Sequence, residues 1–159
     1  AIARALVLGP DLIIADEPVS ALDVSIQSQI LNLFSELREA KGLALLFITH
    51  DLAVVNFIAD RVAVMYLGKI VEIADRDVLL KKSRHPYSQA LRAAVPKTGI
   101  GKRRRGITPA GDPPDPSSPP TGCPFHTRCP KTTEICREIE PDLESVDGDI
   151  RHQVACHFK

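Results

Sequence analysis

Two adjacent carboxylates, Asp16 and Glu17, directly follow the apolar run Leu12–Ala15. Such a run predicts a buried strand, so the two acidic side chains are expected at its carboxyl end. In phosphoryl-transfer enzymes, a carboxylate in this place holds Mg²⁺ and a neighbouring group positions the attacking water. The pattern therefore predicts a nucleotide-hydrolysis site, with Asp16 in the first role and Glu17 in the second. An isolated Asp-Glu pair would instead indicate only a solvated strand end.

A second set of reactive side chains lies near the end of the chain. All its cysteines are there: Cys123, Cys129, Cys136 and Cys156. Disulfides are disfavoured in a reducing cytosol, so clustered cysteines indicate thiolate ligation. Their spacings do not match the paired C-x₂-C knuckles of a zinc ribbon, whereas four thiolates suit an iron–sulphur cluster. Zn²⁺ is an alternative, because His126, His152 and His157 could replace a thiolate. Free or disulfide-linked cysteines are the third interpretation.

The elements that must position the carboxylates alternate between strands and helices, which predicts an α/β fold with parallel strands and crossover helices. Asp23 suits the N-cap of a long amphipathic helix that ends at Gly42, and Asp51 suits the cap of a short one. A hairpin is expected around Gly68-Lys69. Strands are expected at 12–15, 43–48, 62–67 and 70–73, and helices at 24–42 and 51–57.

Beyond the hairpin the pattern changes twice. Asp75 suits the N-cap of a helical run at 78–80, and Pro86 suits the start of a helix to Leu91. Residues 96–120 contain seven prolines and four glycines, which predicts a linker. The basic run Lys102–Arg105 within it indicates either a solvated charge run or a site for an anionic partner such as lipid or RNA.

The composition is typical of a cytosolic globular protein, with 44% hydrophobic and 25% charged residues. No apolar run is long enough to span a bilayer, and no secretory signal is recognisable. The formal net charge is zero, so there is no general attraction to nucleic acid or anionic membrane. We therefore expect no nucleic-acid partner and a membrane link only through partner proteins.

Two segments together resemble a known family. The stretch Asp16–Asp23, followed by Phe47–Leu52, is similar to the second half of the nucleotide-binding domain of ABC transporters. Arg84-His85-Pro86-Tyr87 and the later Cys-Pro-Phe-His-Thr-Arg-Cys-Pro resemble the C-terminal extension of dipeptide and oligopeptide importer ATPases. Val24–Gln27 and residues 60–68 resemble the subunit usually called the F type. The resemblance covers essentially the whole chain.

The resemblance implies a role for each residue of the first site. Asp16 would bind Mg²⁺ through its water shell, and Glu17 would polarise the attacking water. His50 would be the switch histidine that hydrogen-bonds the γ-phosphate of ATP, the alternative being a capping histidine at a strand–helix junction. Ser20 and Asp23 would lie in the D-loop at the seam of an ATPase dimer. The resemblance also implies a [4Fe–4S] cluster at matching cysteines, which would brace the tail.

The domain organisation follows from these assignments. Residues 1–74 are expected to be the C-terminal half of a P-loop ABC ATPase core, 75–95 a helical extension, 96–120 the linker and 121–159 a metal-stapled Cys module. The phosphate-binding Gly-x-x-x-x-Gly-Lys-Ser/Thr loop and the Leu-Ser-Gly-Gly-Gln signature are absent. We therefore expect a C-terminal fragment that is inactive by itself.

The resemblance implies the ATP-hydrolysing subunit of an importer for dipeptides, oligopeptides or similar small solutes. Its partners would be two transmembrane permease subunits, a second ATPase subunit, identical or homologous, and, indirectly, an external solute-binding protein. It would lie in the cytoplasm, peripheral on the inner face of the plasma membrane. Two alternatives remain: a metal-binding interaction module on a degenerate ATPase half, and an ABC ATPase with a task other than transport.

Overall fold

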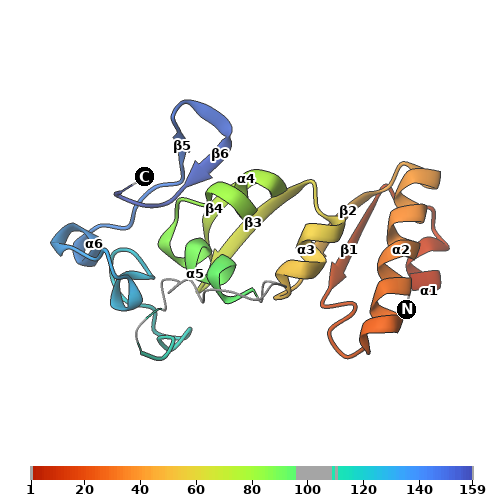
Figure 1. The fold of residues 1–159 in the computed structure, drawn as a ribbon, viewed down its shortest axis with the longest axis horizontal. Coiled ribbons are helices and arrows are strands. Elements are labelled where there is room, and N and C mark those ends of the chain that lie inside the picture. Colours follow the sequence, from red (N-terminus) through yellow and green to blue (C-terminus); the bar gives the residue numbers. More distant parts are fainter. Residues whose placement is uncertain (1, 96–108, 110, 159) are drawn as a thin grey trace, which may run out of the picture. The chain divides into compact units, whose positions relative to one another are not determined.

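The chain divides into two compact units, residues 1–59 and 60–159. The computed structural model describes residues 2–95, 109 and 111–158 (Figure 1). The basic run at 102–105 and most of the predicted linker lie outside the described residues. In the described part of that linker, residues 109 and 111–120, there is no helix or strand, in keeping with its proline content.

Unit 1 is a two-stranded parallel sheet with helices on one face. Its strands pair in register from Leu12↔Ala44 to Asp16↔Ile48. The helices supply Leu31, Phe34, Val54 and Ile58 to a core that also contains Ala15. In chain order the elements are α1 (Ile2–Leu6), β1 (Leu12–Asp16), α2 (Val24–Lys41), β2 (Ala44–Ile48) and α3 (Leu52–Ile58).

The helix ends of unit 1 confirm the predicted caps. The Asp23 carboxylate accepts the backbone N–H of Ile26 at the start of α2, and Gly42 ends the helix with φ of +64°. Asp51 caps α3 by accepting the N–H of Ala53 at 2.7 Å. These caps determine where the chain leaves each strand and enters the next helix.

One expectation for unit 1 differs from the structure. The apolar run of β1 predicts a buried strand, but Leu12 and Ile14 are 51% and 62% exposed while Ile13 and Ala15 are buried. The reason is that α1, α2 and α3 pack on the face that carries Ala15. Parallel sheets are ordinarily covered on both faces, which explains why both faces of this strand are apolar in sequence.

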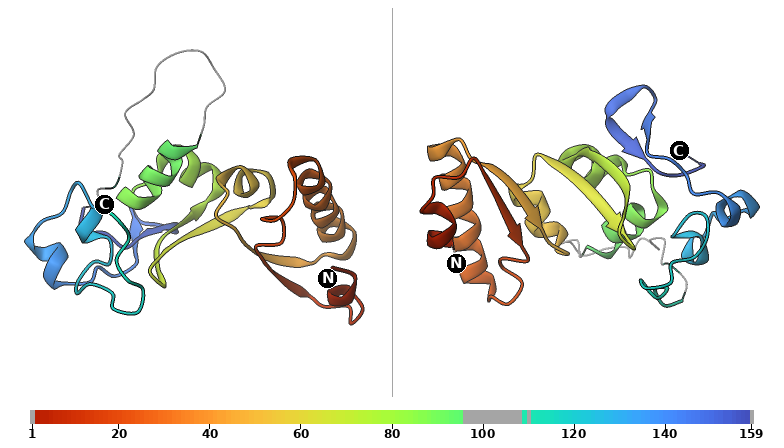
Figure 2. Two further views of the ribbon diagram at one scale, coloured as in Figure 1. Left: turned by 90° about the horizontal axis from the view of Figure 1, so that it is seen from below. Right: turned by 180° about the vertical axis from the view of Figure 1, so that it is seen from behind.

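Unit 2 is built on a four-stranded antiparallel sheet of order β3-β4-β6-β5 (Figures 1 and 2). The predicted hairpin is its first half, with a turn at Leu67-Gly68. Its second half comes from strands near the end of the chain that the sequence did not predict. The elements are β3 (Arg61–Tyr66), β4 (Lys69–Asp75), α4 (Arg76–Lys82), α5 (Pro86–Ala94), the 3₁₀ turn η1 (His126–Arg128), α6 (Glu134–Glu138), β5 (Glu144–Val146) and β6 (Asp149–Val154).

Besides its pairing with β3 in the hairpin, β4 pairs with β6 through Glu72↔Val154 and Ile73↔Gln153. Figure 2 shows the β5–β6 hairpin beside β4. Asp75 differs from expectation: it occupies the N-cap position of α4 but makes no capping hydrogen bond. Its carboxylate instead accepts two hydrogen bonds from Arg151 of β6, at 2.6 and 3.1 Å, because a guanidinium binds a carboxylate in a bidentate manner.

The core of unit 2 joins the hairpin to the Cys module. Phe125 is fully buried, and its ring lies 5.1 Å from that of Tyr66 and 5.4 Å from that of Tyr87. Cys123 and Cys136 belong to the same core as Val71 of β4. The module is therefore packed into unit 2 as part of its core. No described helix has the length and apolar character needed to cross a membrane.

Candidate functional site

The parallel pairing of β1 and β2 brings the predicted catalytic residues to one edge. Asp16 ends β1 opposite Ile48, and the N–H of Glu17 donates to the carbonyl of Ile48 at 3.0 Å. The chain direction is the same in both strands, so the residues that follow them meet at the carboxyl edge of the sheet. Asp16 is exposed and Glu17 is partly buried there.

Glu17 and His50 contact each other directly. Nδ1 of His50 lies 2.8 Å from Oε1 of Glu17, and the two side chains are 78% and 39% exposed. Glu17 has φ of +45°, in the left-handed region that non-glycine residues seldom adopt. The hydrogen bond and the charge of Glu17 raise the pKa of His50, because both favour the imidazolium. The strained turn thus aims a carboxylate at an imidazole.

Ser20 and Asp23 lie on the turn between β1 and α2. Both the N–H and the hydroxyl of Ser20 donate to the carbonyl of Glu17, at 3.3 and 3.0 Å. The Asp23 carboxylate accepts from the N–H of Ile26 and the hydroxyl of Ser25, and these bonds lower its pKa. Ser20 therefore holds the backbone of Glu17, while Asp23 is occupied as the helix cap in this chain.

The alternative role of His50 as a capping residue does not match this geometry. Asp51 is the N-cap of α3, and its own N–H is accepted by the hydroxyl of Thr49 at 3.1 Å. The imidazole of His50 makes no cap and faces Glu17 instead. Chemically, the pair joins a carboxylate that can accept a proton from water to an imidazole that can donate a hydrogen bond to an anion.

The four cysteines of unit 2 are free and lie close enough to influence one another electrostatically. Burial, followed by the neighbouring cysteines, raises the pKa of Cys123 to about 11, and the same causes raise the pKa values of Cys129 and Cys156. The N–H of Cys123 donates to the carbonyl of Cys136 at 2.9 Å. Among residues 2–95, 109 and 111–158, however, no group of three or more Cys, His, Asp or Glu side chains is arranged to hold a metal ion.

The three histidines considered as alternative ligands each have another partner. Nδ1 of His126 lies 2.9 Å from the carbonyl oxygen of Cys123, and Nε2 of His157 lies 3.0 Å from that of Ile139. Nε2 of His152 lies 2.8 Å from a carboxylate oxygen of Glu72. Each of these contacts occupies one of the two ring nitrogens that could bind a metal.

Sequence reasoning missed Glu72, which has no exposed surface. Its carboxylate accepts the backbone N–H groups of Arg84 and His85, at 2.8 and 3.1 Å, in addition to its contact with His152. His85 is 1% exposed, and its Nδ1 accepts the N–H of Tyr87 at the start of α5. The available signal was a single charge within the otherwise apolar stretch 70–74 of β4, since a carboxylate inside such a strand needs buried donors.

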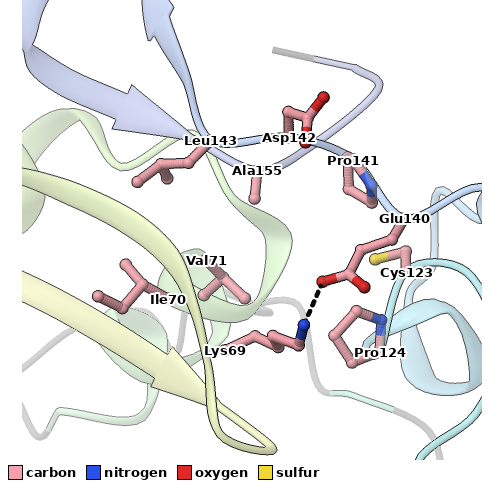
Figure 3. Close-up of a pocket in the computed structure, with 10 residues that line it drawn as sticks. All are labelled: Lys69, Ile70, Val71, Cys123, Pro124, Glu140, Pro141, Asp142, Leu143 and Ala155. Atoms are coloured by element: carbon pink, nitrogen blue, oxygen red, sulfur yellow. Dashed lines mark ion pairs between the residues drawn. The ribbon is translucent and has the colours of Figure 1, made fainter.

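A small cavity of about 160 Å³ lies beside Cys123 (Figure 3). The ion pair of Lys69 with Glu140, at 3.1 Å, lies at this cavity, and Pro124 and Ala155 are among its other lining residues. It lies within unit 2, and Lys69, the cationic side chain of its lining, is paired with Glu140.

Comparison with known proteins adds the family context. Residues 71–136 match the family described as the oligopeptide/dipeptide transporter, C-terminal region. This segment begins in β4 and ends at Cys136, so it includes Glu72, the His85-Pro86-Tyr87 motif and three of the four cysteines.

Relatives align with nearly the whole chain. The probable peptide ABC transporter ATP-binding protein y4tS of Sinorhizobium fredii is 54% identical over 99% of this chain and 44% of its own length. The oligopeptide transport ATP-binding protein AppF of Bacillus subtilis is 54% identical over 99% and 48%. The dipeptide transport ATP-binding protein DppF of Escherichia coli is 48% identical over 98% and 46%. The chain thus spans about half the length of these relatives.

Proposed function

Over the half of their length that it spans, this chain is a relative of the ATP-binding proteins of peptide ABC transporters, and we propose that it forms part of the ATP-hydrolysing subunit of an importer for oligopeptides or dipeptides. The observation that carries the proposal is the contact between Glu17 and His50 at the carboxyl edge of a parallel sheet. Fold-level similarity alone would not assign this chemistry, whereas a base paired with a hydrogen-bond donor supports it.

The proposed roles follow from the positions of the side chains. Asp16 is an exposed carboxylate at the end of β1 and would bind Mg²⁺ through the water shell of the ion. When bound, the ion neutralises charge on the β- and γ-phosphates of ATP. Glu17 accepts a proton from the attacking water and orients it, and His50 donates a hydrogen bond to the γ-phosphate. The Glu17–His50 contact holds both groups at the same edge of the sheet.

The proposed partners come from the same relationship. Ser20 and Asp23 would face a second, identical or homologous ATPase subunit. Closure of this ATPase pair would drive two transmembrane permease subunits, which receive the solute from an external solute-binding protein. The assembly places the subunit at the cytoplasmic face of the plasma membrane. A Gly-x-x-x-x-Gly-Lys-Ser/Thr loop is absent from these 159 residues, so we expect no measurable ATP binding by this chain alone. Micromolar affinity in calorimetry would contradict that.

The test is Glu17→Gln in the intact ATP-binding subunit that contains this sequence. Loss of a general base slows catalysis by about 10²- to 10⁴-fold, so the variant should bind ATP, close with its partner and fail to turn over. Glu36→Gln is the matched control, because Glu36 is exposed on α2 away from the strand ends. Rapid multiple turnover by Glu17→Gln would refute the assignment of Glu17 as base.

A second proposed function concerns the Cys module: a [4Fe–4S] cluster, with Zn²⁺ as the alternative, held by Cys123, Cys129, Cys136 and Cys156. The supporting observation is that hydrogen-bond donors face the sulphur atoms. The N–H of Lys131 points at Sγ of Cys129 and that of Phe158 at Sγ of Cys156, both at 3.4 Å. The Thr133 hydroxyl lies 3.6 Å from Sγ of Cys136, and the N–H of Phe125 bonds to Cys123.

Donors of this kind partly offset the burial that raises the pKa values of Cys123, Cys129 and Cys156, and so favour the thiolate, the ionised form that binds metal. A bound cluster would cross-link segments of a small module. Its role would be structural, without electron transfer during transport. The experiment is an absorption spectrum with iron, sulphide and zinc analysis on anaerobically purified protein. Broad visible absorbance with iron and sulphide, lost in Cys129→Ser, supports the cluster; zinc alone changes the metal, and no metal after reconstitution rejects both.

A further inference from the structure

Three of the four cysteines are positioned by a short local segment. The N–H of His126 donates to the carbonyl of Cys123, that of Cys129 to the carbonyl of His126, and that of Cys123 to the carbonyl of Cys136. These hydrogen bonds span at most thirteen residues. Gly122 lets this segment approach α6, because a Cβ atom there would lie 2.6 Å from the backbone of Arg137.

The fourth cysteine, Cys156, reaches the others by a different route. It follows β6 and Ala155, whose N–H donates to the carbonyl of Val71 in β4 at 2.9 Å. Val71, Cys123 and Cys136 belong to one core, and Cys129 packs against it. Cys156 can therefore join the other three only while β6 is docked against β4.

Two residue pairs of the described strands, Glu72↔Val154 and Ile73↔Gln153, join β6 to β4. The exposed ion pair of Arg151 with Asp75 also links the two strands. Glu72 adds a buried contact between the two strands: its Oε1 lies 2.8 Å from Nε2 of His152, and the two side chains are 0% and 7% exposed. A hydrogen bond to a charged group is stronger when it is removed from water, and a buried carboxylate that loses a donor is destabilised.

We propose that Glu72 is a positioning residue that, through His152, places Cys156 against Cys123, Cys129 and Cys136. Glu72 is suited to this because its other two hydrogen bonds come from the backbone N–H groups of Arg84 and His85, ahead of α5. These two bonds hold the Glu72 carboxylate to the segment ahead of α5, independently of its contact with β6. The inference deepens the second proposed function and rests on the proximity of the four cysteines that it assumes. It does not require a bound metal.

The test measures thiol proximity in metal-free protein with the short bifunctional reagent dibromobimane, in the presence of a chelator. One form of the chain, Cys123→Ser/Cys129→Ser, keeps Cys136 and Cys156. The other, Cys129→Ser/Cys156→Ser, keeps the locally positioned pair Cys123 and Cys136. Both should cross-link. His152→Ala should then slow cross-linking of the first pair by on the order of tenfold and leave the second pair within about twofold.

Four further variants complete the design. Glu72→Ala combined with His152→Ala should lose no more Cys136–Cys156 cross-linking than Glu72→Ala alone, because the two act through one contact. His152→Gln restores a side-chain donor and should recover part of the rate even where His152→Ala folds poorly. Asp75→Asn is the matched control, since it weakens the exposed contact with Arg151 between the same two strands.

Two results would overturn the proposal. One is unchanged Cys136–Cys156 cross-linking in His152→Ala; the other is an equal loss in Asp75→Asn, which would assign the effect to strand docking in general. Metal analysis is independent of this experiment. Absence of iron and zinc would remove the metal hypothesis while the cross-linking rates would still decide the role of Glu72.

Discussion

The imidazole of His50 contacts the carboxylate of Glu17 at 2.8 Å, although 33 residues separate them in the chain. The contact exists because β1 and β2 run parallel and end at the same edge, and because Glu17 adopts a left-handed turn. It joins the two groups to which we assign proton transfer and phosphate recognition. Its electrostatic consequence can be measured without nucleotide.

We expect Glu17→Gln to lower the pKa of His50 towards its ordinary value of 6.5. The wild-type carboxylate raises that pKa through its hydrogen bond and its charge, and the neutral amide removes the charge. NMR titration of the imidazole measures the change. Asp51→Asn is the control, because Asp51 contributes least and Asn still caps α3; identical titrations for wild type and Glu17→Gln would contradict the expectation.

A second prediction concerns acid pH. Burial lowers the pKa of His85 from 6.5 to about 4, an effect only partly opposed by the charge of Glu72. Between these values the unfolded chain binds a proton that the folded chain does not, so stability is lost as the pH falls from about 6.5 to about 4. The loss is about 3 kcal/mol for this group.

Urea unfolding between pH 7 and pH 4.5 tests this, with His85→Asn as the comparison. Asn removes the titrating imidazole and keeps a side chain able to cap α5. Glu72 and His152 face the same site in both proteins, so the difference in slope between the two stability curves isolates His85. Parallel curves would show that His85 does not titrate in this window.

The core of unit 2 depends strongly on Phe125. Its fully buried ring contacts Tyr66, Tyr87 and His85, so Phe125→Ala should lower the free energy of unfolding by about 3–5 kcal/mol. Phe158→Ala is the control, because Phe158 is 43% exposed. Denaturant unfolding followed through unit 2 measures both, and equal losses would contradict the packing described above.

Alanine substitution at two glycines distinguishes the cost of a steric contact from the cost of backbone strain. Gly122 and Gly148 have φ of +69° and +80°, so alanine at either position should cost about 1–2 kcal/mol. A Cβ atom at Gly148 meets nothing within 4 Å, whereas at Gly122 it lies 2.6 Å from the carbonyl of Cys136. Gly122→Ala should therefore destabilise unit 2 more and slow Cys123–Cys136 cross-linking. Equal stability of the two variants would show that the segment around Gly122 shifts to accommodate the added Cβ atom without loss of stability.

Local patterns predicted much of unit 1. The alternation of strands and helices, the caps Asp23 and Asp51 and the end of α2 at Gly42 all agree with the structure. In unit 2 the hairpin and the start of α5 at Pro86 agree as well. Each of these features depends on residues within a few positions of one another, which is the range over which periodicity and capping act.

The sequence by itself determined which side chains end the parallel strands and where the cysteines are concentrated. The tertiary structure decided that Asp75 binds Arg151 rather than capping α4, and that Glu72 meets His152 from 80 residues away. No local pattern contains these pairs, because the donors to Asp75 and Glu72 lie 76 and 80 residues away in the chain. The pairing of β4 with β6 brings each donor to its carboxylate, and long-range packing of the unit 2 core specifies this pairing.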